Sequence, residues 1–189
     1  MTTISIIGTG NMGGALAGMA AKGGAEVQLV SRGDRELTGD IVLLAVPYPE
    51  IDDVVANFGD RLEGKIVVDI TNPIDFSTFD RLVVPPDSSA AAVIADKLPG
   101  ARVLKAFNTN FAATLAAGVV GDDPVTVLVA GDDQDAKDAL LAVVRAAGLR
   151  GQDAGPLARA RELESIGFLQ LTLAVADKLA WNAGFTLVG

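Results

Sequence analysis

The residues of this chain with the clearest chemical implication are three glycines near its beginning, in the pattern Gly8-x-Gly10-x-x-Gly13. A mostly apolar run, residues 4–7, leads into them, and an Ala-, Leu- and Met-rich helical stretch follows as far as Ala21. In a dinucleotide site the first glycine permits a tight strand-to-helix turn, the second lets the backbone approach a pyrophosphate, and the third allows close helix packing. The helix N-terminus then favours negative charge. The pattern predicts a dinucleotide-binding turn, and a glycine-rich turn without a ligand is the alternative.

The residues after the expected second strand bear on which dinucleotide is bound. NAD sites usually place an acidic residue there, which binds the ribose 2′-hydroxyl. This chain has Ser31-Arg32, with Arg35 close behind, and a hydroxyl beside a guanidinium suits a 2′-phosphate. Thr9, inside the glycine turn, adds a second hydroxyl on the same side. We therefore expect NADP(H); Asp34 keeps NAD(H) open, and ordinary solvated charges are the alternative for the arginines.

Two more strand ends are expected at the same edge of the sheet, where ligands of open α/β sheets bind. Residues 45–47 end the third strand, and their backbone is expected to line the adenosine or pyrophosphate part of the cleft. Residues 69–73 end the fourth strand and should lie further along, towards the nicotinamide. We expect the glycine turn to place Met12 towards the nicotinamide ribose, and a flexible gap-filling side chain is the alternative. Turn formation by Pro and Asn is the alternative explanation for both strand ends.

The chain contains no histidine and no cysteine, and Tyr48 is its single tyrosine. It therefore lacks the commonest general acid/base, the commonest metal ligand and any thiolate nucleophile. The reaction must need little proton transfer from side chains. Hydride transfer between two bound cofactors meets this requirement, because the protein supplies mainly placement. We expect no metal site.

Composition narrows the class of protein further. The net charge of −9 argues against nucleic acid as a partner, because such binding depends on Lys and Arg neutralising phosphates. No apolar run approaches the roughly 20 residues of a membrane-spanning helix, and a strand from residue 3 leaves no room for a signal peptide. We expect a cytoplasmic protein without a membrane partner. Its 189 residues suit one α/β domain rather than a Rossmann domain plus a large substrate domain.

Strand-like and helical segments alternate along the chain, which predicts an α/β fold with a Rossmann-type, doubly wound parallel sheet. Strands are expected at residues 3–7, 25–30, 41–46, 65–70, 102–106, 125–130 and 149–153, and helices at 11–22, 49–57, 88–97, 110–117, 133–147 and 156–180. Only residues 31–40 separate the second and third strands, so this second crossover is shortened.

We expect residues 1–189 to form a single NADP-binding domain with a C-terminal helical extension over about 156–189. The last helix is longer than so small a domain needs, and apolar residues recur along it at helical spacing. This favours a homodimer interface, and plain core packing is the alternative.

Several segments, taken in chain order, together resemble the coenzyme F420-dependent NADP reductases: Gly8-Thr9-Gly10-Asn11-Met12-Gly13, Ser31-Arg32, Ala45-Val46-Pro47, Lys105-Ala106-Phe107-Asn108, Asp153-Ala154-Gly155-Pro156-Leu157 and Arg161-x-x-Glu164-Ser165. The resemblance covers essentially the whole chain. Residues 105–115 are also similar to the NADPH domains of the STEAP metalloreductases. The best match is a group of short bacterial dinucleotide-binding oxidoreductases of unassigned substrate.

This resemblance implies that Thr9, Ser31 and Arg32 bind the 2′-phosphate of NADPH, whose hydride passes to a stacked flavin or deazaflavin such as F420, FMN or FAD. Residues and resemblance together predict a cofactor site made of Gly8, Thr9, Gly10, Asn11, Met12, Gly13, Ser31, Arg32, Arg35, Ala45, Val46, Pro47, Thr71 and Asn72. The acceptor ring is expected beside Asn72 and against Phe107, Asn108 and Asn110.

The predicted function is therefore an NADPH-dependent oxidoreductase that transfers hydride between NADP(H) and a small-molecule acceptor, a deazaflavin or flavin. One alternative is reduction of a small imine or carbonyl, as in pyrroline-carboxylate reductases, which share the Gly-x-Gly-x-Met start. That chemistry needs a proton donor, for which Lys105 and Tyr48 are weak candidates. A second alternative is a non-catalytic NADPH-binding sensor.

Overall fold

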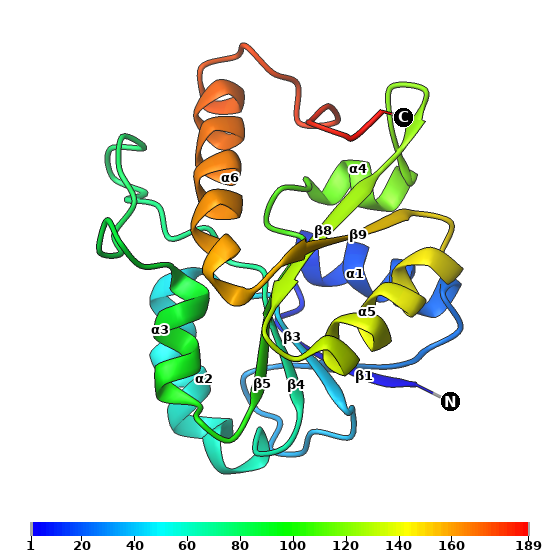
Figure 1. Ribbon diagram of the computed structural model, residues 1–189, viewed down its shortest axis with the longest axis vertical. Coiled ribbons are helices and arrows are strands. Elements are labelled where there is room, and N and C mark those ends of the chain that lie inside the picture. The colour runs from blue at the N-terminus through cyan, green and yellow to red at the C-terminus, as the bar shows by residue number, and fades with distance from the viewer. Residues whose placement is uncertain (1, 189) are drawn as a thin grey trace.

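A seven-stranded sheet in the order β2-β1-β3-β4-β5-β8-β9 organises the molecule, and the computed structural model describes residues 2–188 (Figure 1). Its strands are β1 (Thr3–Ile7), β2 (Glu26–Val30), β3 (Ile41–Leu44), β4 (Ile66–Asp69), β5 (Arg102–Lys105), β6 (Val119–Val120), β7 (Asp123–Pro124), β8 (Thr126–Gly131) and β9 (Arg150–Gly155). The α-helices are α1 (Asn11–Lys22), α2 (Ile51–Phe58), α3 (Ala90–Lys97), α4 (Ala112–Ala117), α5 (Gln134–Ala146) and α6 (Ala160–Val175). The predicted α/β fold class with a Rossmann-type sheet is confirmed.

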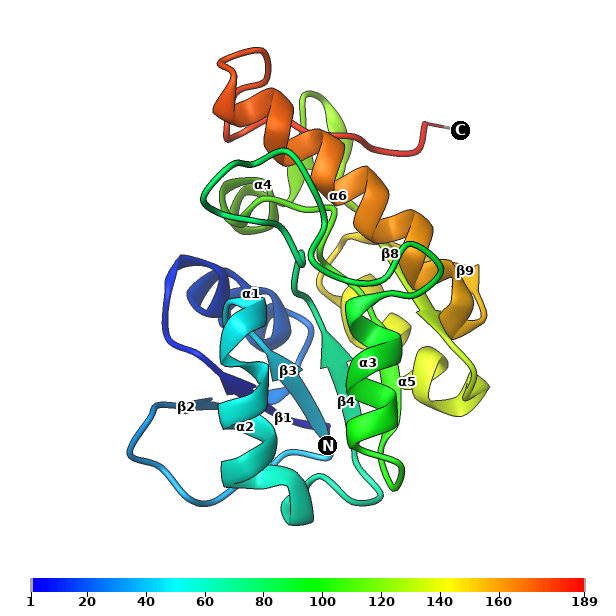
Figure 2. The same cartoon turned by 90° about the vertical axis from the view of Figure 1, so that its left-hand side faces the viewer.

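The first five strands of the sheet are parallel to one another and are covered on both faces. Alternate residues of β3 point to opposite sides: Ile41 and Leu43 join the core beneath α1 and α5, whereas Val42 and Leu44 join the core beneath α2 and α3. Figure 2 views the molecule from the side of α2 and α3. Burial on both faces explains why these strands are continuously apolar in sequence.

The connection between β2 and β3 is a loop, as the sequence predicts. Residues 31–40, all within the described part of the chain, contain turns and extended backbone but no helix. No helix of this connection therefore covers the sheet beside β2. The space between the end of β2 and α2 stays open, and it forms one side of the candidate site.

The expectation of an entirely parallel sheet is wrong for the last two strands. β8 pairs antiparallel with β5, through Leu104 opposite Gly131 and Lys105 opposite Ala130, and β9 pairs parallel with β8. The cause is the chain between β5 and β8, where α4 and the β6–β7 hairpin replace a crossover helix. The chain then enters β8 from the end at which it left β5. The first residues of β8 extend beyond the paired end of β5.

The helical extension is shorter than expected, because α6 ends at Val175 and residues 176–188 form turns and coil. Asp177 adopts a left-handed conformation with φ of 56°. Its N–H donates to Ala174 O (3.1 Å), and the Lys178 N–H donates to Leu173 O (2.8 Å), which is a Schellman-type helix end. The following segment folds back past α4 towards β8 (Figure 1), where Thr186 and Thr126 share a hydrogen bond of 3.0 Å.

Candidate dinucleotide and acceptor site

The three glycines of the turn between β1 and α1 meet different surroundings. Gly8 has φ of 117°, and a Cβ placed there would lie 2.1 Å from the carbonyl oxygen of Ala45. A Cβ on Gly13 would lie 2.1 Å from Gly8 O, whereas a Cβ on Gly10 would meet no atom within 4 Å. Packing therefore requires the first and third glycines. The second leaves open space, which is what close approach of a phosphate needs.

The N-terminus of α1 faces this open space without a capping side chain. Gly10 is the N-cap residue in extended conformation, and within the described chain no side chain accepts from the first helical N–H groups. Unpaired amides at the start of a helix, together with its dipole, form a binding site for an anion. The turn therefore has the geometry of an anion-binding site.

A cavity of about 530 Å³, here cavity 1, opens on the β2 side of the glycine turn. Residues predicted for the cofactor line much of it: Gly8, Thr9, Gly10, Ser31, Arg32, Ala45, Val46 and Pro47. The remaining walls come from β1, β2 and the segment Glu50–Phe58, none of which the sequence analysis assigned to the site. Helix α2 contributes because it follows the third strand and packs beside the open loop.

Arg32, Asp34 and Arg35, beside cavity 1, each contact another side chain of the protein. Arg32 is 90% exposed, and its Nη2 lies 3.1 Å from Glu50 Oε1. Ser31 donates from its backbone N–H (2.7 Å) and from Oγ (2.8 Å) to Asp34 Oδ2, and these hydrogen bonds lower the pKa of Asp34. Arg35 donates to Asn57 Oδ1 at 3.0 Å and does not line the cavity itself. Two carboxylates therefore adjoin the hydroxyl and guanidinium predicted to bind the 2′-phosphate.

A second cavity of about 450 Å³, here cavity 2, lies on the other side of the glycine turn. It brings together the predicted residues Asn11, Met12, Asn72, Phe107, Asn108 and Asn110. Its other walls are Ile70, the start of α4 with Phe111, and Leu171 and Trp181 from the C-terminal part of the chain. Because Gly10 lines cavity 1 and Asn11 lines cavity 2, the turn separates the two cavities by one residue.

Three asparagines shape the floor of cavity 2. Asn72 Nδ2 donates to Asn108 O (2.9 Å), while Asn108 Nδ2 donates to Asn72 Oδ1 (3.1 Å) and to Leu163 O (2.8 Å). Asn110 Nδ2 donates to Thr126 O at 3.0 Å. Within residues 2–188 the buried Oδ1 atoms of Asn108 and Asn110 have no hydrogen-bond partner. A buried acceptor without a partner lowers the stability of the fold.

Backbone strain occurs at the same place. Phe107 is fully buried and has φ of 62°, a conformation that costs a non-glycine residue about 1–3 kcal/mol and often occurs at binding sites. It lies between β5 and the asparagines.

Gly13 and Thr71, both predicted for the cofactor site, line neither cavity. Gly13 packs α1 against the turn. Thr71 is buried, with its carbonyl oxygen accepting a hydrogen bond from Lys105 at 2.7 Å.

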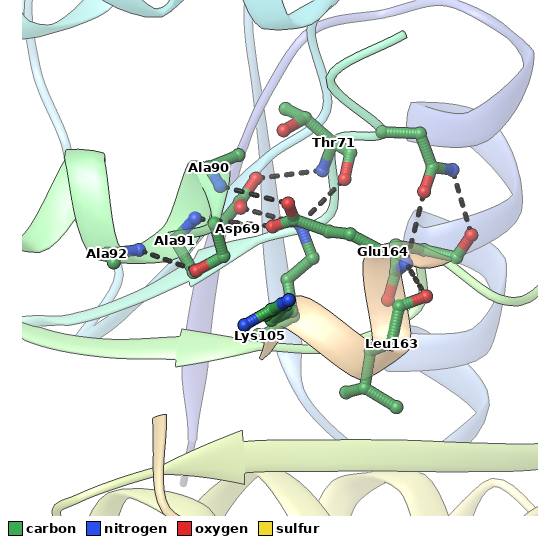
Figure 3. Close-up of polar contacts among 12 residues, drawn as sticks. Asp69, Thr71, Ala90, Ala91, Ala92, Lys105, Leu163 and Glu164 are labelled. Atoms are coloured by element: carbon green, nitrogen blue, oxygen red, sulfur yellow. Dashed lines mark hydrogen bonds and ion pairs between the residues drawn. The ribbon is translucent and has the colours of Figure 1, made fainter. Parts of the chain in front are cut away.

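A buried cluster of charged side chains lies beneath the site (Figure 3). Lys105 Nζ contacts Asp69 Oδ2 at 2.7 Å and Glu164 Oε1 at 2.8 Å, and all three side chains are at most 1% exposed. Glu164 also accepts from the N–H groups of Ala90 (3.0 Å) and Ala91 (3.4 Å) at the start of α3. Burial raises the pKa of Glu164, and the neighbouring ammonium of Lys105 opposes this only in part.

This cluster fixes α6 against the floor of cavity 2. The residue before Glu164, Leu163, accepts from Asn108, and a Cβ on Gly167 would lie 2.3 Å from Asn72 Oδ1. Lys105, considered from the sequence as a proton donor, lines neither cavity and is a structural cation. Tyr48 also lines neither cavity. Its pKa is raised, mainly by burial and to a smaller extent by the negative charges of Glu164 and Asp69.

The described residues offer neither a cluster of metal ligands nor a membrane-spanning helix. Between residues 2 and 188 no group of three or more His, Cys, Asp or Glu side chains is arranged to hold a metal ion. No helix in that range has the length and apolar character needed to cross a membrane.

The sheet, the glycine turn and the two adjoining cavities define the class of the molecule: it is a Rossmann-type dinucleotide-binding protein. The family model described as NADP oxidoreductase coenzyme F420-dependent matches residues 36–73. The chain is 32% identical to the F420-dependent NADP reductase of Methanocaldococcus jannaschii, over 77% of this chain and 66% of that protein. It is 30% identical to the reductase of the same name from Methanothermobacter marburgensis, over 78% of this chain and 68% of that protein.

The chain therefore belongs to the F420-dependent NADP reductase family, as the resemblance in sequence predicted. It is also 32% identical to metalloreductase STEAP3 of Rattus norvegicus, over 86% of this chain but only 36% of that longer protein. A crystal structure of a candidate F420-dependent NADP reductase from Arthrobacter sp. FB24 superposes with a TM-score of 0.85 at 25% identity, covering 100% of both chains. The chain thus spans just under two thirds of the first of these relatives and about a third of STEAP3.

Proposed function

We propose that this protein is an NADP-dependent oxidoreductase that transfers a hydride between NADP(H) and a planar deazaflavin or flavin acceptor, with F420, FMN and FAD as the candidates. The observation that carries the proposal is the position of the two cavities. They adjoin at the glycine turn, so a dinucleotide extending from cavity 1 brings its nicotinamide to the edge of cavity 2. Membership of the reductase family supports the same activity.

In this proposal the chain binds and orients the reactants. The open space at Gly10 and the start of α1 hold the pyrophosphate, and residues 45–47 line the adenosine part of cavity 1. Asn11, Met12 and Asn72 adjoin the nicotinamide, and the acceptor occupies cavity 2 against Phe107, Asn108 and Asn110. The hydride chemistry is supplied by the nicotinamide and acceptor rings when they are bound, so the protein contributes placement and exclusion of water.

The preference for NADP(H) over NAD(H) rests on Ser31 and Arg32 at the mouth of cavity 1. Arg32 is exposed and can exchange Glu50 for a 2′-phosphate, whose charge and geometry a guanidinium fork matches better. Titration of NADPH and NADH into the wild type and Arg32→Ala tests the preference. Loss of NADPH affinity in the variant, with NADH affinity unchanged, is expected; equal affinities in the wild type would contradict it.

Reduction of an imine or carbonyl is less well supported, because it requires a side-chain proton donor near the substrate. Lys105 is fully buried, and its ammonium contacts Asp69, Glu164 and the Thr71 carbonyl. The described residues that line cavity 2 are apolar or amide-bearing. Such a lining suits a reaction in which the rings carry the chemistry.

Anaerobic stopped-flow absorbance tests the proposed activity. The protein is mixed with NADPH and, separately, with F420, FMN or FAD, and nicotinamide oxidation is followed with acceptor reduction. We expect the two signals to change at the same rate with at least one acceptor. If all three fail while NADPH still binds, the oxidoreductase proposal is wrong and a non-catalytic NADPH-binding sensor is favoured.

We also propose a homodimer, acting in the cytoplasm. Support for the dimer comes from α6, whose inner face packs on the molecule while Ile166, Leu169 and Val175 are exposed. Light scattering after gel filtration of the wild type and Leu169→Glu tests this, since a dimer through α6 should dissociate in the variant. Cell fractionation tests the location.

A further inference from the structure

The single tryptophan of the chain lies at cavity 2, and the sequence analysis did not assign it a role. Trp181 belongs to the segment after α6 and is 54% exposed. Its ring centroid lies 5.0 Å from that of Phe111, with the planes tilted by 47°, and both residues line the cavity. A large aromatic side chain is thus held half-exposed at the wall of a cavity instead of being buried in the core.

The segment that carries Trp181 is fixed on both sides of the indole. Before it, the Schellman-type end of α6 sets the direction of the chain. After it, the Phe185 N–H donates to Gln170 Oε1 (3.3 Å), and the Leu187 N–H donates to Thr126 Oγ1 (3.3 Å). Gln170 is itself buried within α6. These contacts hold the indole beside Phe111 and so give cavity 2 an aromatic side.

The lining of cavity 2 restricts the kind of molecule that fits it. Of the described residues that line it, none is charged. Its apolar surface comes from Met12, Ile70, Leu171 and two aromatic residues, Phe111 and Trp181, and its polar groups are side-chain amides. The cavity therefore suits a flat, largely apolar ring.

We propose that Trp181 positions the hydride acceptor, and that its indole forms the aromatic wall on which a planar tricyclic ring of the flavin or deazaflavin type stacks. This inference rests on the proposed function and names the residue that selects its second substrate. The recognised element is the ring, and a charged tail extends away from the cavity. Aromatic contacts of this type contribute enough that their loss weakens binding roughly 10-fold.

Tryptophan fluorescence tests the proposal directly, because all of the signal comes from Trp181. Riboflavin, FMN and 8-hydroxy-5-deazariboflavin are titrated into the full chain saturated with NADP⁺, with correction for absorbed light. We expect saturable quenching by each ring, with riboflavin and FMN alike to within about threefold. Adenosine 2′,5′-bisphosphate, which carries only the half of NADP that fits cavity 1, should leave the emission unchanged. Absence of quenching by all three rings would overturn the proposal.

Kinetics of variants separates the role of Trp181 from general folding effects. Trp181→Ala should raise the KM for the acceptor roughly 10-fold and leave the Kd for NADPH within about twofold, and Trp181→Phe should restore much of the loss. Phe76→Ala is the matched control, since Phe76 is 51% exposed and does not line cavity 2. If Trp181→Ala turns over with an unchanged acceptor KM, the inference about Trp181 is wrong and the proposed function stands. Quenching without turnover would uphold the ring site and refute the function.

Discussion

Replacing Lys105 by methionine removes the cation from the buried cluster while nearly conserving side-chain length. In the wild type the ammonium lies 2.7 Å from Asp69 Oδ2 and 2.8 Å from Glu164 Oε1, and no part of it is exposed. Without it, two carboxylates face each other in a site that excludes water. We expect Lys105→Met to lower the free energy of unfolding by about 3–5 kcal/mol, because an uncompensated buried charge costs that much.

Lys97→Met is the matched control for this prediction. Lys97 Nζ lies 2.8 Å from Asp52 Oδ1, which is the same separation as in the Lys105–Glu164 pair, but both partners are exposed. A solvated pair of this kind contributes at most about 1 kcal/mol, so the control should differ little from the wild type. The comparison isolates the effect of burial, since the residue type, the substitution and the distance are the same.

Urea unfolding near neutral pH, followed by circular dichroism and by Trp181 fluorescence, measures both variants. The deficit of Lys105→Met should shrink as the pH falls, because protonation of Glu164 removes one of the unpaired charges. A Lys105→Met variant no less stable than Lys97→Met would refute the assignment of Lys105 as a structural cation. The same curves test the prediction of a single domain, for which the two probes must coincide.

The remaining predictions concern the glycines and the buried carboxylate. Gly10→Ala should fold normally but bind NADPH at least tenfold more weakly. Gly8→Ala should lose about 2 kcal/mol of stability or more, because its Cβ meets Ala45 O. Urea unfolding curves and NADPH titrations measure both variants. Gly167→Ala should disturb the Asn72–Asn108 pair and raise the acceptor KM about fivefold, with the NADPH Kd unchanged, in steady-state kinetics. The pKa of Glu164 in the folded protein is raised above its ordinary 4.5, so the stability that this group contributes falls as the pH rises from 4.5 through the raised pKa. The unfolding free energy of Glu164→Gln, taken relative to the wild type, should therefore increase with pH. A difference that does not change with pH would contradict this.

Local sequence was sufficient to predict the part of the fold that we propose binds the nucleotide. The turn at Gly8–Gly13, the open loop after β2 and the ends of β3 and β4 all depend on residues close together in the chain. The periodicity of apolar residues and the position of glycine report on such local geometry. The direction of β8 was not predictable in this way. It depends on where α4 and the β6–β7 hairpin place the start of β8 relative to β5.

Two of the residues that sequence reasoning missed, Glu164 and Trp181, come from the C-terminal part of the chain. Glu164 was quoted only as part of the family pattern, and its burial against Lys105 depends on a contact between residues 59 positions apart, from Lys105 to Glu164. Trp181 was hidden because its segment was expected to continue a helix, whereas Asp177 ends α6 and turns the chain back. The unusual presence of a glutamate and a glutamine on the inner face of α6 was the available signal, since such groups are buried only with partners.

A crystal structure of the protein with NADPH is the sharpest test of the proposed binding mode, because it shows where each part of the nucleotide lies. We expect the pyrophosphate over Gly10 and the start of α1, the 2′-phosphate in contact with Ser31 and Arg32, and the nicotinamide facing cavity 2. A nucleotide bound away from the glycine turn, or a 2′-phosphate in solvent with Arg32 still paired to Glu50, would contradict it.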